Sequence, residues 1–383
     1  MDGELKFNLA DYGEGALGQL EQAVNSNWTS GNGHFTKEVH AFFKAEFGLE
    51  GLLTHSCTAA LEMMALLLDL QPGDEVIVPS FTFVSTATAF DLHGARLVFA
   101  DSDPQYPNLS LDSIKAVVTE RTKAVCVVHY AGAGHEMEEI RDWLAAMDIV
   151  FLEDAAQAVG ATYSTRLGAT LPLGRWGAAS SMSFHETKNV ACGQGGALFI
   201  GRDDWKERSM ALWEKGTNRQ AFFLGLVDKY GWVDKGSSFL ASDITAALLH
   251  SQLLRWKEIH ERRMAIWNRY DAGLRPLEEE GRMACMRIPP NSGHNAHMYY
   301  LLLPGFEARA ALMKHLKSLG IQSTFHYQSL HRSPYVLRTM GEQPDCPHSD
   351  RYSDGLLRLP LHLKLSDADV DRVIDGVRRF FTA

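Results

Sequence analysis

Short apolar strands alternate with helices over the first half of the chain, and this pattern constrains the fold more than any other feature. Strand-like runs lie at 75–79, 96–99, 124–129 and 149–153, and helical patterns lie around them at 58–70, 82–93, 110–118 and 135–147. Such alternation predicts an α/β fold with a mostly parallel sheet. In sheets of this kind, ligands bind beyond the carboxyl ends of the strands.

The pattern changes after residue 245. Residues 244–270 are expected to form one long helix, and its charges between 255 and 263 are typical of a solvated face. A strand-like segment at 298–303 and a helix over 307–319 follow. A chain of 383 residues is enough for two domains or for one large domain with an appendage. The change of pattern favours a boundary at 245.

The composition argues against several classes of protein. The net charge is −10, so no basic face for a nucleic acid is expected. The first residues lack the pattern of a signal peptide, and the most apolar helix, over 61–70, is interrupted by Glu62 and too short to span a bilayer. The five cysteines are scattered without zinc-binding spacing, and no HExxH sequence occurs. We therefore expect reduced thiols, a cytoplasmic location, no membrane partner and no metal site.

One lysine occupies a position suited to covalent chemistry. The apolar strand at 180–184 runs into a short polar segment that contains Lys188, and the glycine-rich segment 193–196 and a second apolar strand at 197–200 follow. A lysine in a tight turn between two buried strands is placed to attack a carbonyl and form a Schiff base. Taken alone, a lysine such as Lys188 is far more often an ordinary surface residue.

Two further stretches carry parts of a ligand site. The strand at 52–55 runs directly into Ser56, Cys57 and Thr58, which start a helix with small side chains, hydroxyls and free N–H groups. This start suits a phosphate group or is a plain helix cap. Asp154 ends an apolar strand and needs a cationic partner such as a protonated pyridine nitrogen, which Gln157 could also reach. The alternative for Asp154 is the N-cap of a helix beginning at 155.

These stretches together carry a resemblance to a known family. The supporting segments are His55–Glu62, Pro79–Thr86, Glu153–Gln157, Ser183–Asn189 and Glu214–Arg219. Through nearly its whole length the chain resembles the sugar-nucleotide aminotransferases of the pyridoxal-phosphate fold-type I superfamily (the DegT/DnrJ/EryC-like family). Within that family it looks most similar to the TDP-4-amino-4,6-dideoxygalactose transaminases. The resemblance implies a seven-stranded, mostly parallel sheet in a large cofactor-binding domain over 1–245, and a smaller α+β domain over 246–383.

The resemblance also implies a role for each matching position. Lys188 would hold pyridoxal 5'-phosphate as a Schiff base and carry protons, and Asp154 would pair with the pyridine nitrogen. The other residues expected to bind the cofactor are Cys57, Thr58, Phe83, Gln157 and Ser183. Those expected to bind substrate are Gly31, His185, Asn218, Arg219, His326, Tyr327 and His331. A bare pair such as His326 and His331 is more often structural than functional. Leu240 stands where many relatives carry an Asn that reaches the neighbouring subunit, so that contact is not expected here.

The expected reaction is transfer of an amino group from L-glutamate to C4 of a nucleotide-linked keto-sugar. In detail, TDP-4-keto-6-deoxy-D-glucose would become TDP-4-amino-4,6-dideoxy-D-galactose. Amination at C3 remains an alternative, because relatives that aminate C3 share every cofactor motif. A sugar dehydratase or a silent binding relative is a further alternative, but the family's dehydratases have His where Lys188 stands. The resemblance also implies a homodimer, with the loop 214–235 lying across the interface.

Overall fold

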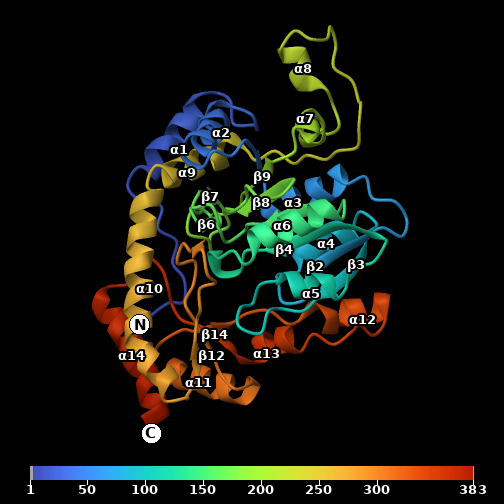
Figure 1. Cartoon of the computed structure of the whole chain (residues 1–383). Helices are drawn as coiled ribbons and strands as arrows, with labels where there is room; N and C mark the ends of the chain where they lie inside the picture. The colour runs from blue at the N-terminus through green and yellow to red at the C-terminus, as the bar shows by residue number, and fades with distance from the viewer. Residues whose placement is uncertain (1–2, 383) are drawn as a thin grey trace.

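The computed structural model describes residues 3–382 and contains two layered regions joined by a long helix (Figure 1). The helices are α1 (Ala16–Asn25), α2 (His34–Phe47), α3 (Cys57–Leu67), α4 (Ser85–Asp91), α5 (Leu111–Lys115), α6 (Met137–Ala146), α7 (Lys206–Trp213), α8 (Arg219–Phe223), α9 (Asp243–Leu253), α10 (Trp256–Glu279), α11 (Phe306–Ser318), α12 (Pro334–Met340), α13 (Pro347–Gly355) and α14 (Asp367–Thr382), with single 3₁₀ turns η1 (Tyr130–Gly132), η2 (Asp203–Trp205) and η3 (Leu330–Arg332). The strands are β1 (Gly51–Thr54), β2 (Glu75–Pro79), β3 (Arg96–Ala100), β4 (Thr122–Val128), β5 (Val150–Asp154), β6 (Thr162–Ser164), β7 (Thr170–Pro172), β8 (Ala179–Ser183), β9 (Gly196–Ile200), β10 (Ala284–Cys285), β11 (Ser292–Gly293), β12 (Tyr300–Leu302), β13 (Thr324–Phe325) and β14 (Leu356–Arg358).

The larger region is built on a seven-stranded sheet. Its strand order is β1-β9-β8-β5-β4-β2-β3. The pairs from β8 through β5, β4 and β2 to β3 are parallel, whereas β9 runs antiparallel to both of its neighbours. The predicted α/β fold with a mostly parallel seven-stranded sheet is therefore confirmed.

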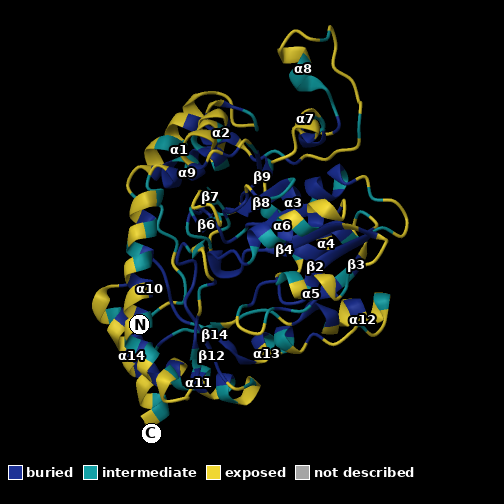
Figure 2. Ribbon diagram, in the orientation of Figure 1, coloured by how far each residue is buried: buried dark blue, intermediate teal, exposed yellow. Residues whose placement is uncertain are grey.

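Side chains of the central strands alternate between two buried layers, as expected for a sheet covered on both faces. In β4 and β5, Val125 and Phe151 pack into one hydrophobic cluster, and Cys126 and Leu152 pack into another. Helices α2, α5, α6 and α9 contribute to the first cluster, and α3, α4 and α7 contribute to the second. Figure 2 shows the resulting buried layers around the strands. This double cover leaves the strand ends as the place for a ligand.

The smaller region combines an antiparallel sheet with long helices. The sheet has the order β10-β12-β14-β13, and α10, α11 and α14 share a buried core with it. The short sheet β11-β6-β7 pairs a segment that precedes β12 with a segment that follows β5. The two regions are thus tied together next to the carboxyl end of β5.

The helix expected over 244–270 is two helices in the structure. Helix α9 ends at Leu253 and α10 begins at Trp256. The buried residues of α9 belong to the core of the larger region, where α9 packs against α1 and α2. Because residue 245 lies inside α9, we propose a domain division at 254–255 rather than at 245.

The segment expected as the loop 214–235 projects away from both cores (Figure 1). It contains the short helix α8 and is held at its base by backbone bridges between Glu214 and Ser238 and between Thr217 and Trp232. Large apolar side chains on this arm are exposed, including Leu226 (73%) and Trp232 (85%). Within residues 3–382, no helix combines the length and apolar character needed to cross a membrane.

Candidate active site

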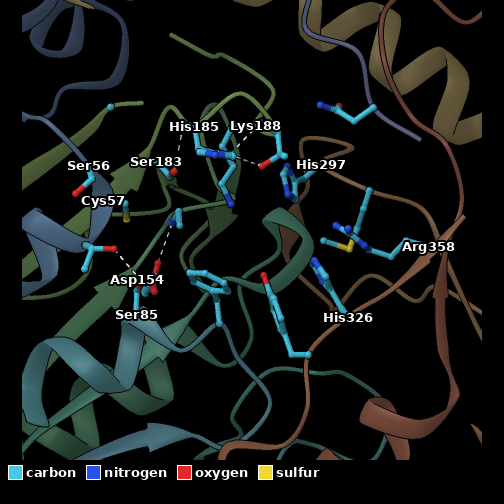
Figure 3. Close-up of a pocket in the computed structure, with 18 of the residues that line it drawn as sticks. Ser56, Cys57, Ser85, Asp154, Ser183, His185, Lys188, His297, His326 and Arg358 are labelled. Carbon is cyan, nitrogen blue, oxygen red and sulfur yellow. Dashed lines mark hydrogen bonds between the residues drawn. The ribbon is translucent and has the colours of Figure 1, made fainter. Parts of the chain in front are cut away.

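A cavity of about 470 Å³ lies between the strand ends of the large sheet and the smaller region. One side, which we call the sheet wall, carries Ser56, Cys57, Thr58, Asp154, Ser183 and Lys188. The facing side, which we call the C-terminal wall, carries Arg263, His297, His326, Tyr327 and Arg358. Figure 3 shows side chains from both walls extending into the same space. Nine of the predicted site residues, from five separate segments, line this cavity: Cys57, Thr58, Phe83, Asp154, Ser183, His185, Lys188, His326 and Tyr327.

Lys188 enters the cavity from the connection between β8 and β9. Its backbone N–H donates to the carbonyl of His185 at 2.8 Å, which forms the turn that aims the side chain inward (Figure 3). Within residues 3–382, Nζ makes no hydrogen bond or salt bridge. Burial of the ammonium group lowers the pKa of Lys188. A free amine at accessible pH is what a nucleophilic lysine requires.

Asp154 stands at the carboxyl end of β5, where a parallel sheet presents ligands. Thr86 Oγ1 donates to its Oδ2 at 2.7 Å, and the N–H of Ala156 donates to its Oδ1 at 3.1 Å. Residues 155–160 form turns, so the alternative that Asp154 caps a helix is wrong. Burial raises the pKa of Asp154, and the hydrogen bond from Thr86 opposes that rise. A cationic group placed beside the carboxylate would lower the pKa again.

Helix α3 begins at the cavity and supplies an anion site. Ser56 is the N-cap, accepting from the N–H of Ala59 at 3.1 Å, and the first helical N–H groups, those of Cys57 and Thr58, have no carbonyl partner inside the helix. Thr58 Oγ1 donates to Ser85 Oγ at 2.8 Å. At Gly196 a Cβ atom would lie 2.3 Å from Cys57 N, so only glycine lets β9 approach the start of α3 this closely. The capped start of α3 thus has the free N–H groups that a phosphate would need.

Gln157 and His331 lie outside the cavity lining. Gln157 accepts from the N–H of Ala131 at 2.7 Å and donates through Nε2 to the hydroxyl of Tyr327 at 3.3 Å, so it stands behind that tyrosine. His331 is 2% exposed, and its Nδ1 lies 2.6 Å from Ser80 Oγ, inside the protein. His331 therefore stabilises the fold from the interior, whereas His326 lines the cavity.

Three predicted substrate residues lie on or near the projecting arm instead of in this cavity. Gly31 and Arg219 line a separate hollow of about 340 Å³. Asn218 accepts from the N–H of Gly231 at 2.7 Å, within the arm itself. In a single chain these residues do not meet Lys188.

The sequence patterns missed most of the C-terminal wall. Arg263 belongs to the charged run expected on a solvated face, but it is 5% exposed and donates to the carbonyls of Ala296 (3.0 Å) and His297 (2.7 Å). Burial lowers the pKa of Arg263 to about 9 and also lowers that of Arg358. Neither arginine makes a salt bridge among residues 3–382, and Arg358 Nε is buried without a partner. A buried and a half-buried cation, both without a carboxylate partner among residues 3–382, indicate that the site accepts an anion.

The sheet wall fits pyridoxal 5'-phosphate. An unpartnered lysine amine, a buried carboxylate and a helix start with free N–H groups supply the three contacts that its aldehyde, ring nitrogen and phosphate need. No group of three or more His, Cys, Asp or Glu side chains in the described part of the chain could hold a metal ion.

Comparison with known proteins agrees with this geometry. A model of the DegT/DnrJ/EryC1/StrS aminotransferase family matches residues 11–378. The chain is 31% identical to the spore coat polysaccharide biosynthesis protein SpsC of Bacillus subtilis, over 98% of this chain and 96% of the relative. It is 30% identical to the dTDP-4-dehydro-2,3,6-trideoxy-D-glucose 4-aminotransferase of Saccharopolyspora spinosa, over 95% and 93%.

Solved structures give the same result. The aminotransferase TlmJ from Streptoalloteichus hindustanus superposes with a TM-score of 0.89 at 29% identity, over 99% of both chains. Spr1654 from Streptococcus pneumoniae, solved in its PLP and PMP forms, superposes with a TM-score of 0.87 at 26% identity, over 98–99% of each chain. The chain therefore belongs to the DegT/DnrJ/EryC1/StrS aminotransferase family and is a pyridoxal-phosphate-dependent sugar aminotransferase.

Proposed function

We propose that the enzyme moves an amino group from L-glutamate to C4 of a nucleotide-linked keto-sugar. The observation that carries this proposal is the opposition of two walls in one cavity. Lys188 and Asp154 occupy the sheet wall, and the unpaired Arg263 and Arg358 occupy the C-terminal wall. Lysine and carboxylate suit transamination, and the arginines suit substrates that carry carboxylate or phosphate groups.

The residues of the sheet wall divide the work. When bound, pyridoxal phosphate supplies an electron sink for the carbon that loses a proton. Lys188 would hold the cofactor, and its released Nζ would take the proton from the donor's carbon and deliver one to the sugar carbon. Asp154 would keep the ring nitrogen protonated, because its buried carboxylate gains a cationic partner there. The N–H groups of Cys57 and Thr58 would bind the phosphate.

The C-terminal wall would hold both substrates by their negative charge. Arg358 is positioned with its guanidinium over the ring of Phe7, 4.6 Å from the centroid, and has no carboxylate partner among residues 3–382. An arginine can bind either a carboxylate or a diphosphate in a bidentate manner. The same wall therefore serves glutamate in one half-reaction and the nucleotide-sugar in the other.

The position and the product come from the resemblance and one relative. The family resemblance points to TDP-4-keto-6-deoxy-D-glucose as the acceptor and TDP-4-amino-4,6-dideoxy-D-galactose as the product. The relative from Saccharopolyspora spinosa is named as a 4-aminotransferase, which favours C4 over C3. The test is incubation of the purified enzyme with this keto-sugar and L-glutamate, followed by NMR of the product. An amine at C4 with the galacto configuration is expected, and an amine at C3 or unchanged sugar would refute the proposal.

The working unit is a homodimer in this proposal. Exposed apolar side chains on the projecting arm need a cover, and isologous dimers are the most common symmetric oligomers. A partner subunit on this arm would bring Gly31, Asn218 and Arg219 to the neighbouring active site, which explains their distance from Lys188 in one chain. A monomer in sedimentation that keeps full activity would refute it. The five free thiols suit the reducing cytoplasm, where we place the enzyme.

A further inference from the structure

His297 lines the cavity on the C-terminal wall, and neither the sequence motifs nor the proposed function uses it. The side chain is 7% exposed and stands on the same side as Arg358 and His326, across from Asp154 (Figure 3). Its segment follows β11 and carries no regular structure. The question is which of its two ring nitrogens faces the substrate and whether that nitrogen donates or accepts.

Asn189, the residue after Lys188, fixes the tautomer of His297. Asn189 Nδ2 donates to the backbone carbonyl of Asn295 at 2.8 Å, so its Oδ1 is the atom that lies 3.0 Å from His297 Nδ1. An amide oxygen only accepts, and therefore Nδ1 of His297 must carry the hydrogen. In a neutral imidazole, Nε2 then has a lone pair and no hydrogen. Nε2 makes no hydrogen bond within residues 3–382.

The backbone around His297 is held in place from three directions. Asn295 donates through Nδ2 to the carbonyls of Gln157 (2.8 Å) and Val159 (2.9 Å) and accepts from the N–H of His297. Arg263 donates to the carbonyl of His297. Ala296 has φ +49°, a left-handed conformation that costs energy for a residue with a side chain. Strain of this kind persists where the surroundings demand one backbone path, and here that path points His297 into the cavity.

The charges around His297 decide what it can bind. Burial, followed by the positive charges of Lys188, Arg263 and Arg358, holds the pKa of His297 well below its usual value, so the ring is neutral. The same cations disfavour a charged ammonium donor at this point. Arginine carries only donors, but Arg263 donates to backbone carbonyls, and neither Arg263 nor Arg358 donates to His297 Nε2 among residues 3–382. A neutral O–H group is therefore the donor best suited to the lone pair of His297 Nε2.

We propose that His297 Nε2 accepts a hydrogen bond from a ring hydroxyl of the keto-sugar, and that Asn189 sets the tautomer that makes this possible. His297 is then a specificity residue and Asn189 a positioning residue. The inference rests on the proposed function, because it assumes a nucleotide-sugar in the cavity. Recognition of the sugar would then depend on Asn189, the residue that directly follows Lys188.

The first experiment compares two substrates with the holoenzyme. The kcat/KM is measured for TDP-4-keto-6-deoxyglucose and for its 2,3-dideoxy counterpart, in wild type and in His297→Phe. We expect the variant to lose about tenfold on the hydroxylated sugar and to change little on the dideoxy sugar. His315→Gln, a distant histidine bonded to the carbonyl of Gly376, is the matched control and should keep the wild-type ratio. An unchanged ratio in His297→Phe would overturn the inference.

The second experiment uses Asn189→Asp, which places a carboxylate beside Nδ1 and raises the pKa of His297. Below the raised pKa the ring is an imidazolium, and Nε2 then donates instead of accepting. The kcat/KM for the hydroxylated sugar should therefore fall with decreasing pH in Asn189→Asp. In wild type, His297 should cause no such fall. If both enzymes have the same pH profile, Asn189 does not set the tautomer and that part is wrong.

Two readouts separate this inference from the proposed function. The glutamate half-reaction, followed by cofactor absorbance, does not involve a ring hydroxyl and should proceed in His297→Phe; its absence in wild type would refute the transaminase proposal. The ¹⁵N shifts of labelled histidine in the free holoenzyme, assigned by the loss of one signal in His297→Phe, should show a neutral ring with hydrogen on Nδ1. Hydrogen on Nε2 would overturn the inference even in an active aminotransferase.

Discussion

The two walls of the cavity are built in different ways, and each leaves different polar groups without a partner. The sheet wall takes its residues from the ends of strands and the start of α3, and it offers a carboxylate and an amine that have few partners of their own. The C-terminal wall is assembled from α10, β14 and two irregular segments, and it offers buried cations without carboxylate partners. In the proposed function, the sheet wall would hold the cofactor and the C-terminal wall would bind the anionic substrates.

The difference between the walls predicts that variants of the sheet wall change the reaction rate and variants of the C-terminal wall change substrate affinity. Damage to the sheet wall should lower the rate of proton transfer, because its groups act on the reacting atoms. Damage to the C-terminal wall should raise KM, because its groups bind parts of the substrate that do not react. Three variants test this division, and each has a matched control elsewhere in the fold.

The largest effect is expected for Asp154→Asn. The amide is nearly isosteric but cannot hold the ring nitrogen protonated, so both half-reactions should slow by roughly 10²–10⁴. Stopped-flow rates with glutamate and with the keto-sugar measure this loss. Asp101, which follows β3 and accepts from the N–H groups of Ser102, His348 and Ser349, lies outside the cavity, and Asp101→Asn should keep both rates. Near-wild-type rates in Asp154→Asn would remove Asp154 from the catalytic residues.

An intermediate effect is expected for Arg358→Met. Loss of the guanidinium should raise KM by about 10–100-fold, as for other charge-assisted contacts, and leave kcat largely intact. Because the variant also removes a half-buried cation without a carboxylate partner, the ligand-free protein should unfold at the same or a higher temperature. A lower melting temperature with an unchanged KM would assign Arg358 to structure.

Arg309→Met is the control for that variant. Arg309 is 7% exposed and donates to the carbonyl of Ser353, but it lies outside the cavity. Its replacement should lower the melting temperature and leave KM unchanged, which is the opposite result on both measurements.

The smallest effect is expected for Ser56→Ala at the start of α3. Loss of the cap should cost about 1 kcal/mol of unfolding free energy. Because the proposed phosphate site uses the same turn, we expect the affinity for pyridoxal phosphate to fall as well. Ser110→Ala removes the cap of α5, far from the cavity, and should cost similar stability without affecting cofactor affinity. Equal cofactor affinity in the two variants would separate the α3 cap from the phosphate site.

The same contrast explains what the sequence could predict. The sheet, the turn that carries Lys188 and the start of α3 are local features, in which strand, turn and reactive residue are neighbours in the chain. The C-terminal wall depends on long-range packing. Arg263 lies in a charged run that reads as a solvated helix face, and only the fold of residues 295–297 against α10 buries it. No local pattern distinguishes such an arginine from its exposed neighbours.

Histidines illustrate the same limit. His326 and His331 are five positions apart, yet one lines the cavity and the other bonds to Ser80 in the interior. The role of His297 requires the positions of Asn189 and Asn295, which come from distant parts of the chain. The sequence also gives no sign of the break between α9 and α10, because no proline or glycine separates the two helices.

Borohydride reduction of the holoenzyme tests the assignment of the sheet wall most directly. If Lys188 holds the cofactor, reduction should remove the visible absorbance band and fix the cofactor covalently on the peptide that contains Lys188, as read by mass spectrometry. Lys188→Ala should bind pyridoxamine phosphate, take no label after reduction and lose turnover by on the order of 10⁴ or more. A label on another lysine, or no label in wild type, would contradict the assignment.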